Sequence, residues 1–176
     1  MAVHAYDAAD RRISTTDIDG NITRFQYDEM GNLLETLDAN GHTTRYEYDA
    51  MNRRTVVIDA NGHRTRTAYD LAGNVIRITD ANGNATAFGY DAAGRHISTT
   101  TSLGNQTFMG FDANGNITHI TDANAVAGIQ PKNSQGASIS RQYDEMNRLV
   151  RMIDAQNGET LYRYDLPRNN TSENSS

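Results

Sequence analysis

The sequence contains no cysteine and no tryptophan, and only two of its 176 residues are proline. Disulfide bonds are therefore excluded as a source of stability. Hydrophobic residues make up 37% of the chain and the mean hydropathy is −0.69, so there is little material for a conventional core. No apolar run approaches the roughly 18 residues that a membrane-spanning helix needs. Residues 1–6 also lack the basic and apolar segments of a signal peptide.

Clustered positive charge is lacking as well. The chain has a single lysine, Lys132, its arginines are scattered, and its formal net charge is −6. Because binding to a phosphate backbone needs clustered Lys and Arg, the sequence predicts no nucleic-acid partner. Fourteen of the sixteen Asp recur at the turn positions described below, so the negative charge has a local structural explanation.

What the chain does contain is an internal repeat of 21 residues. A Tyr-Asp dipeptide begins at Tyr6, Tyr27, Tyr48, Tyr69 and Tyr90, and Phe111-Asp112 stands in the next place. The following dipeptide, at Tyr143, comes 32 residues after Phe111, and Tyr164 restores the spacing of 21. The extra residues, around Pro131, predict a loop inserted at about 124–138.

Each repeat carries two turn signals of the form Asp-x-x-Gly, such as residues 28–31 and 38–41. Asp at the first place of a type I turn accepts hydrogen bonds from backbone N–H groups, and Gly at the fourth place tolerates a positive φ. Asp10, Asn52 and Asn147 replace Gly at the first turn's fourth place, and Asn and Asp also tolerate this conformation. We therefore predict hairpin turns with a bulged exit.

Six to seven residues separate successive turns, which is a strand length and too short for a helix. The predicted fold is all-β: tandem 21-residue antiparallel hairpins that form a curved sheet. A parallel β-solenoid with one repeat per coil is the alternative, and the paired turn signals favour the antiparallel meander.

Alternation along the strands predicts which side chains share a face. Thr44, Tyr46 and Tyr48 should lie on one face, and Arg45 and Glu47 on a wet opposite face. In the strand that follows the first turn, the aliphatic residues expected beside the tyrosines are Leu34, Ile76, Ile97, Val150, Val57, Ile78, Ile120 and Met152. The residues expected on the other face are Arg54, Arg77, His96, His119 and Arg151. A sheet that is apolar on one face must curl round on itself or cover something.

The predicted functional residues are those of the repeat motif itself. They are Tyr6, Asp7, Tyr27, Asp28, Gly31, Tyr48, Asp49, Asn52, Tyr69, Asp70, Gly73, Tyr90, Asp91, Gly94, Phe111, Asp112, Gly115, Tyr143, Asp144, Asn147, Tyr164 and Asp165.

The motif Tyr-Asp-x-x-Gly-Asn, at residues 27–32 and 69–74, followed by Asp-Ala-Asn-Gly and Thr-x-aromatic-x-Tyr, closely resembles the YD repeats of the RHS family. The resemblance covers roughly residues 4–168, in about eight registers, so we predict a repeat array over 1–168 and a polar, disordered tail over 169–176. It implies a β-strip that spirals into a hollow shell, as in bacterial Rhs polymorphic toxins, insecticidal toxin-complex subunits and the teneurins.

This resemblance implies a non-enzymatic wall segment whose partners are the rest of a larger shell and an enclosed toxin or other cargo. A secreted or cell-surface-delivered bacterial protein is then expected. The chain lacks the Asp-Pro cleavage motif of an RHS core, and Tyr164 to Arg168 depart from the repeat. We therefore interpret the chain as a fragment, or a short copy, of a shell wall.

Several more specific functions, such as metal binding and catalysis, compete with this interpretation. Asp17 and Asp19 partly resemble a calcium loop, but the bidentate Glu of such loops is absent, and Asp28 stands in its place. His42 and His63 share a register, yet equivalent residues two strands apart lie near 10 Å, too far for one zinc ion. We predict no metal and no cofactor.

His96 and Ser98 are the candidate base and nucleophile, expected on one strand face. Such pairs arise by chance in a chain rich in Ser and Thr, so we predict no catalytic residues. The alternative function is an exposed carbohydrate-binding or adhesive sheet, in which the tyrosine stripe would stack sugar rings. Accessible tyrosine rings would distinguish it from a wall segment.

Overall fold

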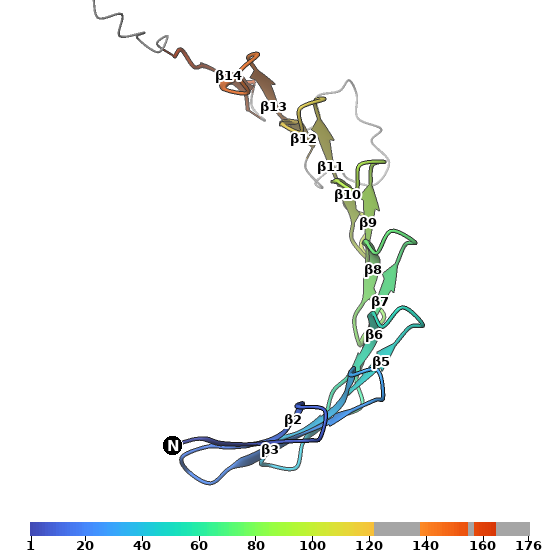
Figure 1. Ribbon diagram of the computed structural model, residues 1–176. Coiled ribbons are helices and arrows are strands. Elements are labelled where there is room, and N and C mark those ends of the chain that lie inside the picture. Colours follow the sequence, from blue (N-terminus) through green and yellow to red (C-terminus); the bar gives the residue numbers. More distant parts are fainter. Residues whose placement is uncertain (122–137, 155–156, 165–176) are drawn as a thin grey trace, which may run out of the picture. The chain divides into compact units, whose positions relative to one another are not determined.

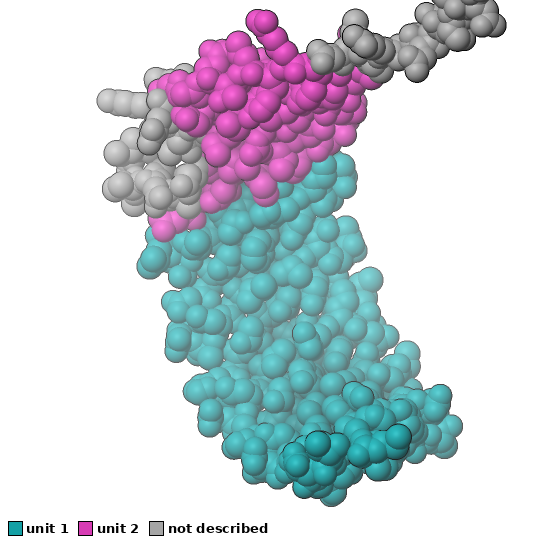
Figure 2. Space-filling model, turned by 90° about the vertical axis from the view of Figure 1, so that its left-hand side faces the viewer, with its two compact units in different colours: residues 1–104 teal, residues 105–176 magenta. Residues whose placement is uncertain are grey.

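The computed structural model describes residues 1–121, 138–154 and 157–164. Throughout these ranges the backbone forms strands and turns, and no helix occurs. None of the described elements is therefore a helix long and apolar enough to cross a membrane. The chain divides into two compact units, residues 1–104 and residues 105–176, which are coloured separately in Figure 2.

Unit 1 is built from ten strands. They are β1 (Val3–Tyr6), β2 (Arg12–Thr16), β3 (Ile22–Tyr27), β4 (Leu33–Leu37), β5 (Thr43–Tyr48), β6 (Arg54–Ile58), β7 (Arg64–Tyr69), β8 (Val75–Thr79), β9 (Ala85–Tyr90) and β10 (His96–Thr100). Unit 2 contains β11 (Gln106–Phe111), β12 (Ile117–Thr121), β13 (Ser138–Tyr143), β14 (Leu149–Ile153) and β15 (Glu159–Leu161).

Within each unit, every strand pairs with the next one along the chain in antiparallel orientation. In β4 and β5, for example, Thr36 faces Thr44 and Leu37 faces Thr43. Figure 1 shows the strands of unit 1 side by side in chain order, with turns alternating between the two edges of a curved layer. This arrangement confirms the antiparallel meander and excludes the solenoid, in which Tyr27 would stack on Tyr48.

The turns adopt the predicted backbone conformation. Gly31 has a φ of 89° and Gly73 one of 93°, at the fourth place of their turns. Asp10, Asn52 and Asn147, the residues that replace Gly, have φ values of 60°, 60° and 59°. Because a β-branched residue is strained in this region, only glycine and small polar side chains suit the position.

The strand that follows each tyrosine-containing turn carries a β-bulge three residues beyond the fourth place of the turn, inside the strand, where the sequence did not reveal one. Tyr48 faces Arg54 whereas Glu47 faces Val56, so Thr55 is an extra residue without a partner. The same irregularity occurs in β3–β4, β7–β8, β9–β10 and β13–β14. The unpaired positions there are Leu34, Ile76, Ile97 and Val150.

The bulge corrects the predicted faces. Arg54 and His96 were expected opposite the tyrosines but lie beside them, because the extra residue shifts the alternation by one place. The Arg54 guanidinium carbon is 5.4 Å from the centre of the Tyr46 ring, and His96 contacts Phe88 and Tyr90. The prediction holds beyond the bulge: Val57 faces Tyr46, and Ile120 faces Met109, with His119 on the other face.

The described residues have very little core. The only buried hydrophobic side chain among them is Val56, which is 8% exposed. Val56 faces Glu47 and Arg66, so it lies on the face that was predicted to be wet. Leu37 and Ile58 lie there too, facing Arg24 and Arg45. The prediction of a sheet that is apolar on one face only is therefore wrong, since both faces mix aliphatic and polar side chains.

Two predicted segments cannot be compared with the structure. The inserted loop at about 124–138 falls outside the described residues except for Ser138, where β13 begins. The tail at 169–176 and Asp165 of the last Tyr-Asp pair also lie outside the described residues.

Candidate functional site: the tyrosine edge

The Tyr-Asp pairs lie in the hairpin turns at one end of the strands. We name this row of turns, along one side of each unit, the tyrosine edge. Its turns begin at Asp7, Asp28, Asp49, Asp70, Asp91, Asp112 and Asp144. The opposite edge carries the turns that begin at Asp17, Asp38, Asp59, Asp80, Thr101 and Asp154. Both sets close with a hydrogen bond from the fourth residue to the first, such as Gly31 N to the Asp28 carbonyl at 3.2 Å.

The aspartate side chain holds each turn from inside. Oδ1 of Asp49 accepts hydrogen bonds from the backbone N–H groups of Met51 and Arg53, at 2.9 and 3.0 Å. Its Oδ2 accepts one from Nε of Arg53 at 2.8 Å. These donors, the Arg53 backbone N–H first among them, lower the pKa of Asp49. In Asp28 the side-chain amide of Asn32 is the main cause of the lowered pKa. The carboxylates therefore act as fixed acceptors that organise the turn.

The residue that follows each tyrosine-edge turn alternates between Arg and Asn. It is Arg at 11, 53, 95 and 148, and Asn at 32, 74 and 116. Two hairpins therefore form one larger repeat of 42 residues, which is the spacing from Arg11 to Arg53 and from Arg53 to Arg95. The sequence analysis missed these residues, although the alternation is visible in the sequence once the turns are aligned.

The arginines bind the next turn along the edge. Nη1 of Arg53 donates a hydrogen bond to the Asp70 carbonyl at 2.7 Å, and the guanidinium lies 4.7 Å from the centre of the Tyr69 ring. Arg11 makes the same two contacts with the Asp28 carbonyl, at 2.6 Å, and with Tyr27, at 5.2 Å. One guanidinium therefore joins its own aspartate, the following turn and the following tyrosine.

The asparagines continue this linkage. Nδ2 of Asn32 donates to Oδ1 of Asn52 at 2.8 Å, in the next turn, and Nδ2 of Asn116 donates to Oδ1 of Asn147 at 2.9 Å. Asn52 and Asn147 are the residues with positive φ that stand in place of Gly. Their side chains thus accept a link that glycine could not, in addition to tolerating the conformation.

The tyrosine hydroxyls form a third series of links. The Tyr48 hydroxyl donates to the Leu33 carbonyl at 2.9 Å, and that of Tyr69 donates to the Arg54 carbonyl at 2.9 Å. Each bond joins a strand to the start of the strand before it, fifteen residues earlier. The other bonds of this series are Tyr27 to Arg12, Tyr90 to Val75, Tyr143 to Ile117 and Tyr164 to Leu149.

These links lie where the regular pairing of neighbouring strands ends. The ladder between β6 and β7 runs only from Ile58 and Arg64 to Val56 and Arg66. Beyond Val56 the bulge ends the regular pairing at the tyrosine edge. There the Tyr69 hydroxyl binds the Arg54 carbonyl, and Arg53 binds the Asp70 carbonyl. The tyrosine edge is therefore a structural clamp that joins each hairpin to the next one.

Not every predicted motif residue can make the tyrosine hydroxyl bond of this clamp or is covered as the other tyrosines are. Tyr6, in the first strand, is 53% exposed. Phe111 occupies the tyrosine position in unit 2 and has no hydroxyl to donate. Tyr27, Tyr48, Tyr69, Tyr90 and Tyr143 are half-buried. That the motif residues serve a biological function beyond holding the sheet together stays a prediction.

The candidate catalytic pair is not assembled. His96 faces Tyr90, whereas Ser98 faces Gly89, and the bulge between them puts the two side chains on opposite faces. This corrects the expectation that they share a face. Nε2 of His96 instead lies 2.9 Å from the Thr99 hydroxyl. In the part of the chain that the structure describes, no group of three His, Asp or Glu side chains could hold a metal ion.

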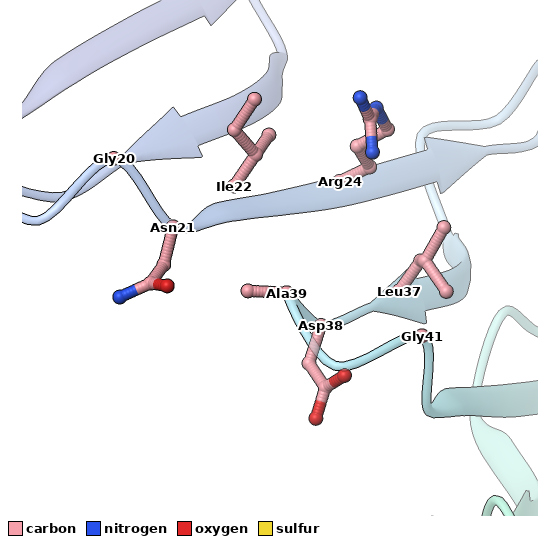
Figure 3. A pocket seen from close by; sticks show the side chains of 8 residues that line it. All are labelled: Gly20, Asn21, Ile22, Arg24, Leu37, Asp38, Ala39 and Gly41. Carbon is pink, nitrogen blue, oxygen red and sulfur yellow. The ribbon is translucent and has the colours of Figure 1, made fainter.

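The histidines of the opposite edge belong to their own turns. Nδ1 of His42 is 3.0 Å from Oδ2 of Asp38, and Nδ1 of His63 is 2.9 Å from Oδ2 of Asp59. Both histidines are exposed, as predicted. An open depression of about 360 Å³ lies at this edge between the turns at 17–20 and 38–41 (Figure 3). Asp38 and Arg24 are the charged residues that line it.

Comparison with known proteins places this geometry in a family. A family model described as RHS Repeat matches residues 6–43, 31–65 and 69–106, which together span more than half of the chain. Among curated proteins no relative matches.

Solved structures were also found to be similar to this chain. One described as the crystal structure of TcdB2-TccC3-Cdc42 is similar with a TM-score of 0.51 and 15% identity, over 93% of this chain and 12% of that one. Another, of TcdB2-TccC3 without its hypervariable C-terminal region, has a TM-score of 0.47 and 19% identity, over 85% of this chain and 10% of that one. The first likeness supports the fold alone, and the chain spans about an eighth of the matched chain, 12% of its length.

Proposed function

The chain belongs to the RHS repeat family, and from this premise we propose that it is a non-enzymatic wall segment of an RHS-type β-shell. The shell would enclose a toxin or another cargo polypeptide. The segment would be one part of a larger secreted or delivered bacterial protein, and its partners would be the rest of the shell wall and the enclosed cargo.

The single observation that carries this proposal is a sheet held together along its edge and almost without a core. Val56 is the only buried hydrophobic side chain among the described residues. Aliphatic side chains such as Leu34, Ile76 and Ile78 stay 38–39% exposed. A surface of this kind is stable when it covers something or is covered. Within each unit, the links at the tyrosine edge supply what a wall needs, a connection from hairpin to hairpin.

The tyrosines favour a wall over the carbohydrate-binding alternative. In Tyr48 and Tyr69 the hydroxyl is bound to a backbone carbonyl, and the ring of Tyr69 is also covered by the Arg53 guanidinium. Sugar rings stack on aromatic faces that are open to solvent. Rings held in this way pack against the sheet itself. Because the arrangement repeats along the sheet, it favours a structural role over a local binding site.

The proposal is tested by imaging the full-length parent protein. Electron cryomicroscopy of that protein should show residues 1–164 as part of a closed wall, with additional density enclosed by it. A parent protein in which this sheet is open to solvent on both faces, with nothing enclosed, would contradict the proposal. If binding of glycans to the intact protein also disappeared on substitution of Tyr48 and Tyr69, the carbohydrate alternative would replace it.

A further inference from the structure

The face of unit 1 opposite the tyrosines carries a column of arginines. Arg24, Arg45 and Arg66 occupy the same place in β3, β5 and β7, 21 residues apart. Arg45 faces Glu35 and Ile58, and Arg66 faces Val56 and Thr79, which puts the column on one face. We name this surface the arginine face. It consists of the exposed residues Arg24, Arg45, Arg64, Arg66 and Arg77.

The arginine face has more positive charge than its own acids neutralise. Its glutamates in β3–β8 are Glu35 and Glu47, which pair with Arg45 at 2.9 Å and with Arg64 at 3.1 Å. Within the described residues Arg24, Arg66 and Arg77 have no acidic partner. This excess stands out in a chain whose formal net charge is −6.

The arginines of the tyrosine edge differ from those of the arginine face in their contacts, because they bind groups of the sheet itself. Arg11, Arg53 and Arg148 each pair with the Asp of their own turn and each cover a tyrosine ring. Arg24 and Arg66 make neither contact. Three exposed guanidinium groups, which have no ion pair within the described residues, leave their charge available to an anionic partner.

The side chains between the arginines indicate the class of that partner. Leu37, Val56 and Ile58 lie on this face beside Arg24, Arg45 and Arg66. In β3–β8 the aromatic residues lie on the other face, as the pairing of Phe25 with Thr36 and of Tyr46 with Val57 requires. Nucleic acids and sugars stack on aromatic rings, which this face does not offer. Guanidinium groups with aliphatic neighbours suit a polypeptide that is both acidic and apolar.

Figure 3 shows one end of this surface. Ile22, Arg24 and Leu37 project to the same side of the sheet, whereas Asn21 and Asp38 project to the other side. The three side chains line the depression of about 360 Å³. The column therefore begins beside an open depression that aliphatic, polar and charged residues line together.

We propose that the arginine face binds an extended polypeptide segment that carries acidic and apolar side chains. Successive arginines of the column lie two strands apart, near 10 Å. That distance matches three residues of a segment in the extended polyproline II conformation, which rises about 3.1 Å per residue and turns every third side chain to the same side. The binding follows from the charges of the face itself. Only the identity of the segment, as part of the enclosed cargo, rests on the wall function proposed above.

The test measures binding of two labelled synthetic peptides to the purified protein by fluorescence anisotropy. One peptide has Glu at every third position among Leu, Ser and Gly, and the other has Lys in place of each Glu. The Glu peptide should bind more tightly, and added salt should weaken its binding. Arg24→Gln combined with Arg66→Gln should weaken binding of the Glu peptide about tenfold or more.

A matched variant removes the same charge from the other face. Arg12→Gln combined with Arg54→Gln should change binding less than about twofold, because these arginines lie over Phe25 and Tyr46. Thermal unfolding shows whether both variants remain folded. Should Arg24→Gln with Arg66→Gln fail to fold, Arg24→Ala alone and Arg66→Lys alone replace it, with weaker binding expected only for the first.

Three outcomes would overturn the inference. Equal loss of affinity in both double variants would show an unspecific effect of net charge. Single-stranded DNA or heparin that binds through Arg24 and Arg66 as tightly as the Glu peptide would show a general polyanion site. Absence of any Glu-peptide binding would also refute it, yet would leave the wall function standing, because imaging of the parent protein tests that separately.

Discussion

The two edges of the sheet use the same aspartate turn but differ in what surrounds it. At the opposite edge, in the turns that begin at Asp17, Asp38, Asp59 and Asp80, the described hydrogen bonds of the aspartates stay inside the turn. At the tyrosine edge, Arg53 and Asn32 reach the next turn, and tyrosine hydroxyls reach the preceding strand. One edge consists of independent turns, and the other is connected along its length.

The bulge explains why the edges differ. It interrupts the backbone ladder beside the tyrosine edge, so that β6 and β7 lose their regular pairing beyond Val56 and Arg66. Side-chain hydrogen bonds join neighbouring hairpins there. A repeat array is as stable as the contacts between its neighbouring units, so contacts at this edge contribute to the stability of the whole sheet.

Acid should have the largest effect, because it acts on both edges at once. The pKa is lowered in eleven turn aspartates from the ordinary value of 3.8. The unfolded chain then binds more protons than the folded one in this window. The free energy of unfolding should therefore be constant above the ordinary value and fall as the pH drops through the lowered pKa values.

Chemical denaturation at a series of pH values, roughly from pH 6 to pH 2, measures this dependence. Asp49→Asn at the tyrosine edge and Asp59→Asn at the opposite edge should each remove part of the slope. A free energy of unfolding that does not change over this range would contradict the role assigned to the carboxylates.

A β-branched residue at a turn glycine should have the next largest effect. Gly73 has a φ of 93° and open space around the Cβ position, so the cost of Gly73→Val is backbone strain, about 1–3 kcal/mol. Gly73→Asn should cost much less, since Asn52 and Asn147 adopt the same conformation. Urea denaturation compares the two variants, and equal stability would show that this position does not require a positive φ.

Gly83→Val is the matched change at the opposite edge, where φ is 86°. Its local strain should be similar. Gly73→Val should in addition accelerate amide exchange near Tyr90, because the Tyr90 hydroxyl binds the Val75 carbonyl just after the altered turn. If the disturbance spread equally far in both variants, the two edges would not differ as described.

Arg53→Ala should have an intermediate effect. It removes the hydrogen bond to the Asp70 carbonyl and the contact with the Tyr69 ring, together about 1–2 kcal/mol. His63→Ala is the control, since His63 occupies the equivalent place at the opposite edge, is exposed and contacts only its own turn. Thermal unfolding should show a clear decrease for Arg53→Ala and a small one for His63→Ala. The reverse order would contradict the comparison.

The smallest effect is expected for a single hydroxyl. Tyr48→Phe removes the bond to the Leu33 carbonyl and should cost about 0.5–1.5 kcal/mol. Tyr46 stands on the same strand and face, and its hydroxyl has no partner among the described residues. Tyr46→Phe should therefore be nearly neutral when both variants are compared by denaturant unfolding. Equal losses would show that the hydroxyl bonds do not hold the edge together.

Turn chemistry is what made most of this fold predictable from the sequence. The motif Asp-x-x-Gly predicts the conformation of each turn, and the six to seven residues between successive motifs predict the length of each strand. The strands and their antiparallel order followed from these two observations. The bulge inside the strand, unlike the bulged exit of the turn, was not predictable, because Thr55 and Leu34 carry no local signal such as Gly that would mark an extra residue. For that reason Arg54 and His96 were assigned to the wrong face. The role of Arg53 depends on contacts with the next hairpin, at Tyr69 and Asp70. An alignment of single turns does not show contacts between hairpins.

The central claim is that side chains at the tyrosine edge join successive hairpins where the backbone ladder ends. Residue-resolved hydrogen exchange in Arg53→Ala combined with Tyr69→Phe tests it most directly, with His63→Ala as the control. Amides of β6 and β7 near Val56 and Arg66 should exchange about tenfold faster or more in the double variant, and should keep their protection in the control. Unchanged protection at these amides in the double variant, or the same loss in both proteins, would contradict the claim.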